Sequence, residues 1–139
     1  MSLKAPITNI SRGSLHDGEG VRTVVYFKGC TLRCAWCHNP ETLSLRNEIL
    51  YAAQKCIHCG KCVEICPEHH KISGNDMLFE RSGCTLCGKC VENCPSLALS
   101  FCSEDKTVDE VFDEIKKDFH YYKASNGGVT FSGGECLLY

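Results

Sequence analysis

The chain has 139 residues, a formal net charge of −2 and 13 cysteines. The charge gives no basic surface for nucleic acid, and no apolar run is long enough for a membrane span or a secretory leader. We therefore expect a cytoplasmic protein that binds neither nucleic acid nor a membrane. An odd number of cysteines, most of them in CxxC runs, favours metal clusters over a disulfide scaffold.

The first strong strand signal runs from Val21 to Phe27, a near-continuous apolar run typical of a buried parallel strand. It leads directly into a loop with the spacing CxxxCxxC, formed by Cys30, Cys34 and Cys37. Three thiolates can hold one 4Fe-4S cubane, but a cubane has four irons, so one iron stays open to another ligand. Trp36 in the same loop is either hydrophobic cover for the cluster or a surface on which a ligand ring stacks.

Two copies of the run CxxCxxCxxxCP follow, beginning at Cys56 and Cys84. In the bacterial ferredoxin pattern, the fourth cysteine of each run ligates the cluster of the other run. The predicted ligand sets are therefore Cys56, Cys59, Cys62 and Cys94 for one 4Fe-4S cluster, and Cys84, Cys87, Cys90 and Cys66 for the other. A zinc site would need separated pairs of cysteines, which does not fit these runs.

Two elements are expected outside the cysteine runs, a short strand over Ile7–Ile10 and a helix that begins after Thr107. Thr107 and Glu110 have the spacing of a capping box. Apolar residues from Val108 to Tyr122 recur at helical spacing and predict one packing stripe. Ser125–Gly128 should end this helix.

A second strand is predicted over Val129–Ser132, and Gly133, Gly134 and Glu135 follow it. Two glycines at the end of a strand permit close approach of the backbone to a ligand. A carboxylate beside them can accept hydrogen bonds from an ammonium group. The three residues are common in turns, and they gain weight only when paired with a CxxxCxxC loop on an earlier strand.

Together these motifs resemble the glycyl-radical-enzyme activating enzymes, which are pyruvate formate-lyase activase-like members of the radical S-adenosylmethionine (SAM) superfamily. The residues that carry the resemblance are Ser14–Gly18, Gly20–Thr23, Gly29–Cys37, Asn39–Glu41, the two ferredoxin runs and Gly127–Glu135. The resemblance implies an α/β fold, the N-terminal part of a β/α barrel, with an inserted α+β bacterial ferredoxin-like module. We expect the barrel to begin in residues 1–50, the insert to span 51–103, and a barrel helix and strand to fill 104–139.

The resemblance also implies a function. Cys30, Cys34 and Cys37 would hold the SAM-binding cluster, Gly133–Glu135 would bind the amino group of SAM, and Trp36 would lie near its adenine. Reductive cleavage of SAM would give a 5′-deoxyadenosyl radical that abstracts hydrogen from a glycine of a partner glycyl radical enzyme. The two auxiliary 4Fe-4S clusters would carry electrons from flavodoxin or ferredoxin.

Two other functions remain open from the sequence, a ferredoxin-like electron-transfer protein and a radical SAM peptide maturase. The barrel of the family has more strands than this sequence supplies. We therefore expect a fragment, produced by a truncated gene, an interrupted reading frame or the excision of a domain. No motif identifies the glycyl radical enzyme that the complete protein would activate.

Overall fold

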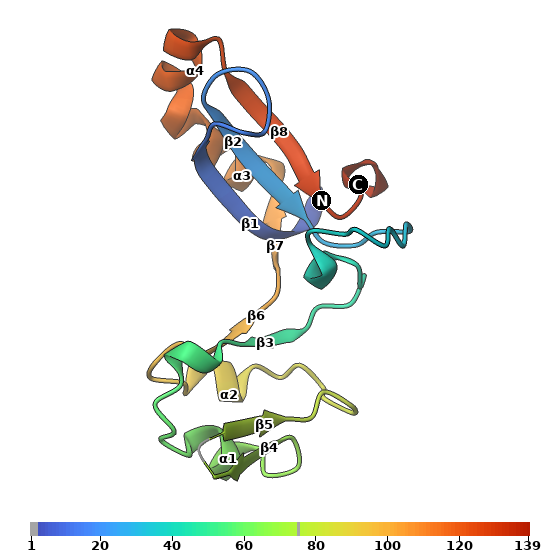
Figure 1. The fold of residues 1–139 in the computed structure, drawn as a ribbon, viewed down its shortest axis with the longest axis vertical. Helices are drawn as coiled ribbons and strands as arrows, with labels where there is room; N and C mark the ends of the chain where they lie inside the picture. The colour runs from blue at the N-terminus through green and yellow to red at the C-terminus, as the bar shows by residue number, and fades with distance from the viewer. Residues whose placement is uncertain (1–2, 75) are drawn as a thin grey trace. The chain divides into compact units, whose positions relative to one another are not determined.

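The computed structural model describes residues 3–74 and 76–139, and Figure 1 shows its elements in chain order. The chain divides into two compact units. The first contains the residues up to Arg46 together with Ser103–Tyr139, and the second is Asn47–Cys102. Among the described residues, no helix is long and apolar enough to cross a membrane.

A four-stranded mixed sheet forms the first unit, in the order β7-β1-β2-β8. The strands are β1 (Lys4–Ser14), β2 (Arg22–Phe27), β7 (Glu104–Thr107) and β8 (Gly128–Gly133). β1 is antiparallel to both β2 and β7, whereas β2 and β8 are parallel and lie side by side in Figure 1. The strands predicted around residues 21–27 and 129–132 are confirmed, and the predicted short strand over 7–10 is part of the longer β1.

The predicted helix after Thr107 is present but is not continuous. Its capping box is confirmed, because Glu110 N donates to Thr107 Oγ1 and Thr107 N donates to Glu110 Oε2. The helical segment is divided into α3 (Val108–Ile115), the 3-10 turn η3 (Lys116–Asp118) and α4 (Phe119–Ser125). The prediction of a single apolar packing stripe was also wrong in part, since Val108 and Phe112 are 65% and 60% exposed.

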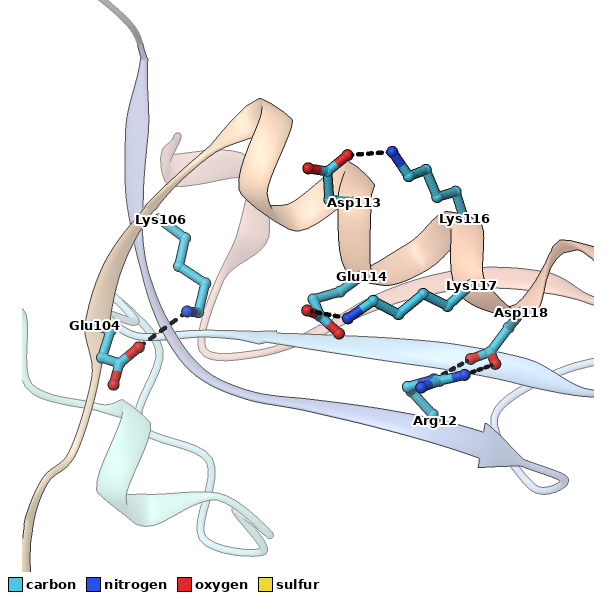
Figure 2. Close-up of polar contacts among 8 residues, drawn as sticks. All are labelled: Arg12, Glu104, Lys106, Asp113, Glu114, Lys116, Lys117 and Asp118. Carbon is cyan, nitrogen blue, oxygen red and sulfur yellow. Dashed lines mark hydrogen bonds and ion pairs between the residues drawn. The ribbon is translucent and has the colours of Figure 1, made fainter.

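A buried polar network ties this helical segment to the sheet. Asp118, only 3% exposed, accepts hydrogen bonds from Arg12 Nε (2.9 Å) and Arg12 Nη2 (2.5 Å), as Figure 2 shows. Thr23 Oγ1 donates to Asp118 Oδ2 at 2.7 Å, and Tyr122 OH donates to Thr23 Oγ1 at 2.5 Å. A carboxylate can be buried at this position because several donors replace the water that it loses.

The described residues of the second unit form two small antiparallel pairs of strands and two short helices. β3 (Ile49–Tyr51) pairs with β6 (Leu99–Phe101), and β4 (His70–Ser73) pairs with β5 (Asp76–Phe79). The helices are α1 (Lys61–Ile65) and α2 (Lys89–Glu92). Its core is small, formed by Ile49, Met77, Cys90 and Leu99, with further cysteines packed against it.

The internal repeat in the sequence is also a repeat of backbone conformation. α1 and α2 begin after Gly60 and Gly88, whose φ angles are 78° and 80°. His58 and Leu86, at equivalent places in the two runs, have positive φ angles of 54° and 59°. The two cysteine runs therefore fold in the same way. The described residues also form three further 3-10 turns: η1 (Pro40–Thr42), η2 (Ala53–Lys55) and η4 (Cys136–Leu138).

Candidate functional site

The parallel pairing of β2 and β8 brings the CxxxCxxC loop and the Gly-Gly-Glu segment to the same edge of the sheet. Phe27, the last residue of β2, is the register partner of Gly133, the last residue of β8. The contact continues past both strands, because Gly134 N donates to Phe27 O and Glu135 N donates to Gly29 O, each over 2.8 Å. Two motifs that lie about 100 residues apart in the sequence are therefore joined by backbone hydrogen bonds.

Both glycines of the segment are required by this close approach of the two strands. A Cβ atom on Gly134 would lie 2.1 Å from Gly29 O, and one on Gly133 would lie 2.5 Å from Phe27 O. Gly133 also has a φ of 93°, a conformation that residues with side chains rarely adopt. The structure thus gives the two glycines a role in bringing β8 against the cysteine loop.

The carboxylate of Glu135 is half-buried and partly engaged. Its Oε1 accepts a hydrogen bond from Leu137 N at 3.0 Å and lies 4.0 Å from the thiol of Cys136. Its Oε2 has no hydrogen-bond partner among the described residues. Glu135 therefore caps η4 with one oxygen and keeps acceptor capacity on the other.

The CxxxCxxC loop is anchored at its base and open at its tip. Gly29 N donates to Thr42 O at 2.6 Å, and Cys30 N donates to Leu43 O at 3.3 Å. Cys30 and Cys37 are half-buried, whereas Cys34 is exposed. Trp36 is 78% exposed, so its indole is accessible in the first unit.

Lys28, which precedes the loop, is fully buried and was not singled out from the sequence. Its Nζ donates to Glu41 O at 2.7 Å, and its backbone N donates to Pro6 O at 2.9 Å. Its backbone carbonyl accepts a hydrogen bond from Tyr139 OH at 2.5 Å. A lysine between an apolar strand and a cysteine loop gives no periodic signal, so only the three-dimensional structure reveals that this side chain fastens the loop to η1.

In the second unit, the eight cysteines of the two ferredoxin runs line two separate cavities. Each cavity takes three cysteines from one run and the fourth from the other run. The first is lined by Cys56, Cys59, Cys62 and Cys94, and the second by Cys66, Cys84, Cys87 and Cys90. These are the two sets that the sequence pattern predicts for crossed ligation.

The residues in the two cavities fit 4Fe-4S clusters chemically. Each cavity offers four thiols, the donor set of such a cluster. Among the described residues, no three Cys, His, Asp or Glu side chains are grouped as they would be around a single metal ion. A 4Fe-4S cubane requires a different arrangement, because each of the four thiolates binds a different iron.

Burial and neighbouring thiols oppose ionisation inside these cavities. Burial raises the pKa of Cys62, and the charges of Cys56 and Cys59 raise it further. The same is true of Cys90, whose pKa is raised by burial and by the charges of Cys84 and Cys66. Gathering thiolates in this way is unfavourable without a compensating cation, and bound iron would supply that charge.

Three other groups in the cavities have displaced pKa values. A hydrogen bond with Cys56, together with burial, raises the pKa of Tyr51 to about 12. Burial alone would raise the pKa of Cys94, but hydrogen bonds from the backbone of Leu99 and from Ser96 outweigh burial and lower it. Burial lowers the pKa of His70, which lines the second cavity. The sequence gives no signal of burial for His70, because the neighbouring residues are polar.

Family models of iron-sulfur domains match two overlapping parts of the chain. A 4Fe-4S single cluster domain matches residues 16–76, and a 4Fe-4S dicluster domain matches residues 55–98. The chain is therefore a mixed α/β protein with 4Fe-4S ferredoxin-type domains.

Curated relatives match nearly the whole chain. It is 45% identical, over 97% of its length, to a choline trimethylamine-lyase activating enzyme of Oleidesulfovibrio alaskensis. It is 41% identical, over 99% of its length, to a benzylsuccinate synthase activating enzyme of Thauera aromatica, and 45% identical, over 94%, to a trans-4-hydroxy-L-proline dehydratase activating enzyme of Clostridioides difficile.

The aligned region covers 45%, 44% and 44% of these three relatives, so the chain spans about half the length of the proteins it matches. These relatives are glycyl-radical-enzyme activating enzymes. The resemblance predicted from the motifs is confirmed.

Proposed function

We propose that this chain is the part of a radical SAM activating enzyme that holds the SAM-binding cluster and two auxiliary clusters. The complete enzyme would generate a glycyl radical in a partner enzyme. The observation that carries the proposal is the parallel β2–β8 pair, which puts Gly29, at the start of the cysteine loop, within hydrogen-bond distance of Glu135. Homology to activating enzymes over nearly the whole chain supports the same function.

The proposed architecture is the first portion of a β/α barrel with an insert. Residues 1–50 and 104–139 would belong to the barrel, and residues 51–103 would be the ferredoxin-like insert. These bounds lie within four residues of those of the compact second unit, Asn47–Cys102. In support, β2 and β8 are adjacent and parallel, and α3 and α4 lie between them in the chain. Parallel strands connected through helices are the building unit of such barrels.

In the proposed site, Cys30, Cys34 and Cys37 would hold three irons of a 4Fe-4S cluster. Gly134 N and Glu135 N are already engaged with Phe27 and Gly29. The acceptors of this segment include backbone carbonyls and Glu135 Oε2. Acceptors complement an ammonium donor, so we assign Gly133–Glu135 to the amino group of SAM. The exposed face of Trp36 would stack on the adenine.

When reduced and bound to SAM, the cluster would supply the electron that cleaves SAM to methionine and the 5′-deoxyadenosyl radical, which takes a hydrogen atom from a glycine of the partner. The protein contributes position and electrostatics. The crossed cysteine sets would hold the two auxiliary clusters, with flavodoxin or ferredoxin as the proposed electron donor. The partner is proposed to be a glycyl radical enzyme.

The proposal can be tested on the anaerobically reconstituted chain. SAM added to the dithionite-reduced protein should change the electron paramagnetic resonance (EPR) spectrum of one cluster, and 5′-deoxyadenosine should form. The matched control is Cys34→Ala, which removes one ligand of the first cluster and should abolish both effects while the signals of the two auxiliary clusters persist. A spectrum that SAM leaves unchanged, with no 5′-deoxyadenosine formed, would favour an electron-transfer protein or an inactive fragment instead.

A further inference from the structure

The side chain of His70 is buried in the second unit and has no hydrogen-bond partner among the described residues. It is 1% exposed, and neither Nδ1 nor Nε2 has a partner among the described residues. Its ring stacks on Phe79, with the ring centroids 4.7 Å apart and the planes 11° from parallel. A buried polar group without a partner is costly, so native proteins nearly always provide one.

The side chain lines the second cysteine cavity. The four thiols of Cys66, Cys84, Cys87 and Cys90 line the same cavity. The backbone is fixed there as well, because His70 N donates to Cys66 O at 3.0 Å. A ring N–H donor that has no acceptor in the described part of the chain therefore shares a cavity with the proposed ligands of an electron-rich cluster.

The other copy of the repeat lacks this donor. His70 is four residues after Cys66, the cysteine that crosses into the second cavity. The residue four after Cys94, which crosses into the first cavity, is Ala98, and it lines that cavity while 2% exposed. The repeat therefore folds without a histidine at this position. The second cavity has an imidazole where the first has the methyl group of an alanine.

We propose that His70 donates a ring N–H to a sulfur of the cluster held by Cys66, Cys84, Cys87 and Cys90 and thereby raises the reduction potential of that cluster. This inference rests on the ligand assignment made above. A hydrogen bond to a cluster sulfur favours the reduced state because reduction adds negative charge, and such bonds are among the factors that set iron-sulfur potentials. The neighbouring His69 is already engaged, with its Nδ1 3.0 Å from Glu80 O.

The test is an EPR-monitored redox titration of the reconstituted chain carrying His70→Phe. Phenylalanine keeps the stack on Phe79 and removes the donor. We expect the equilibrium constant for reduction of one auxiliary cluster to fall about tenfold, equivalent to about 59 mV for a one-electron couple. The potential of the other auxiliary cluster should not change. His70→Asn, which retains an N–H, should restore part of the lost potential.

The control is His69→Phe, the same substitution at the adjacent residue. Equal potentials in wild type and His70→Phe, or an equal fall in His69→Phe, would overturn the role of His70 and leave the cluster assignment intact. A wild-type chain that binds no cluster through Cys66 and Cys87 would overturn the assignment as well.

A second measurement needs no variant and so does not depend on how well His70→Phe folds. In wild-type protein labelled with ¹⁵N-histidine, pulsed EPR should detect a weak nitrogen coupling to the reduced cluster. Absence of any coupling would overturn the proposal. A coupling strong enough for direct ligation to iron would also overturn it, because a histidine would then be a ligand of the cluster and not a hydrogen-bond donor to its sulfur.

Discussion

The backbone N–H of Glu135 donates to the carbonyl oxygen of Gly29 over 2.8 Å, and this bond fastens the Gly-Gly-Glu segment to the start of the CxxxCxxC loop. The bond is possible only because Gly134, which lies between the end of β8 and Glu135, has no side chain to meet Gly29 O. The proposed SAM site therefore depends on backbone geometry at the strand ends as much as on the side chains that would contact the ligand.

Replacing Gly134 with alanine should separate the two halves of the proposed site. Its new Cβ would meet Gly29 O at 2.1 Å, so the backbone has to move. We expect a loss of about 1–3 kcal/mol in the free energy of unfolding and a loss of the EPR response to SAM. Denaturant unfolding and EPR on the reconstituted chain measure the two effects.

The matched control is Gly128→Ala at the other end of β8. A Cβ there would make ordinary contacts, the nearest at 3.7 Å to the guanidinium of Arg22. This variant should retain both its stability and its response to SAM. If Gly134→Ala bound SAM as well as Gly128→Ala does, the proposed dependence on the Gly29 contact would be refuted.

The crossed ligand sets predict which cysteine variants lose the same cluster. Cys66→Ser and Cys87→Ser should each remove one auxiliary cluster, about a third of the bound iron. Because both residues line the second cavity, the double variant should lose no more than either single variant. Cys66→Ser combined with Cys59→Ser should lose both auxiliary clusters, since Cys59 lines the first cavity. Iron analysis and EPR spin counting would measure the losses.

Cys102→Ser is the control for these variants, because Cys102 is a buried cysteine outside the residues that line either cavity. It should retain all the iron. Additive loss in the Cys66→Ser, Cys87→Ser pair would mean that the runs bind their own clusters without crossing.

Much of the second unit could be predicted from the sequence, because cluster ligation follows a short local pattern. The spacing of Cys56, Cys59 and Cys62 and the position of Cys94 one repeat later were sufficient to predict the residues around the first cavity. His70 could not be predicted in this way. Its burial depends on the pairing of β4 with β5, which no local pattern encodes.

In the first unit, the strand positions could be predicted from the sequence, but the buried polar contacts could not. Val24 and Val25 are fully buried, as the apolar run predicted. Asp118 follows two exposed lysines and has the sequence context of a helix surface, yet it is buried against Arg12. Contacts between residues 106 positions apart have no local signature, so the break at η3 was missed together with the ion pair.

The Asp118 network predicts how stability depends on pH. The hydrogen bond from Arg12, followed by that from Thr23, lowers the pKa of Asp118 below its ordinary value of 3.8. A lowered pKa in the folded state means that the carboxylate stabilises the fold above pH 3.8, and that this stability is lost as the pH falls through the lowered value. Asp118→Asn should lower the free energy of unfolding by about 1–2 kcal/mol at pH 7. The variant should also lose less stability than the wild type as the pH falls.

Urea unfolding of both proteins between neutral and acidic pH would test this expectation. Asp113→Asn is the control, because Asp113 is an exposed residue that pairs with Lys116 on the surface of the helix. It should leave the stability at pH 7 nearly unchanged. Parallel pH profiles for wild type and Asp118→Asn would contradict the assignment of the acid sensitivity to Asp118.

A substitution of Trp36 can distinguish its two predicted roles, cover for the cluster and stacking on a ligand ring. Because the side chain is 78% exposed, its loss should affect stability little, so a change in affinity would report on ligand binding. Trp36→Ala should change the free energy of unfolding by no more than about 0.5 kcal/mol, as expected for an exposed residue. If the indole stacks on adenine, the same variant should bind SAM about fivefold more weakly, a loss of about 1 kcal/mol. Trp36→Phe, which keeps an aromatic face, should bind with intermediate affinity. Calorimetric titration of the reconstituted chain would measure this series, and if all three proteins had equal affinity, Trp36 would have no part in binding and the interpretation as cover for the cluster would remain.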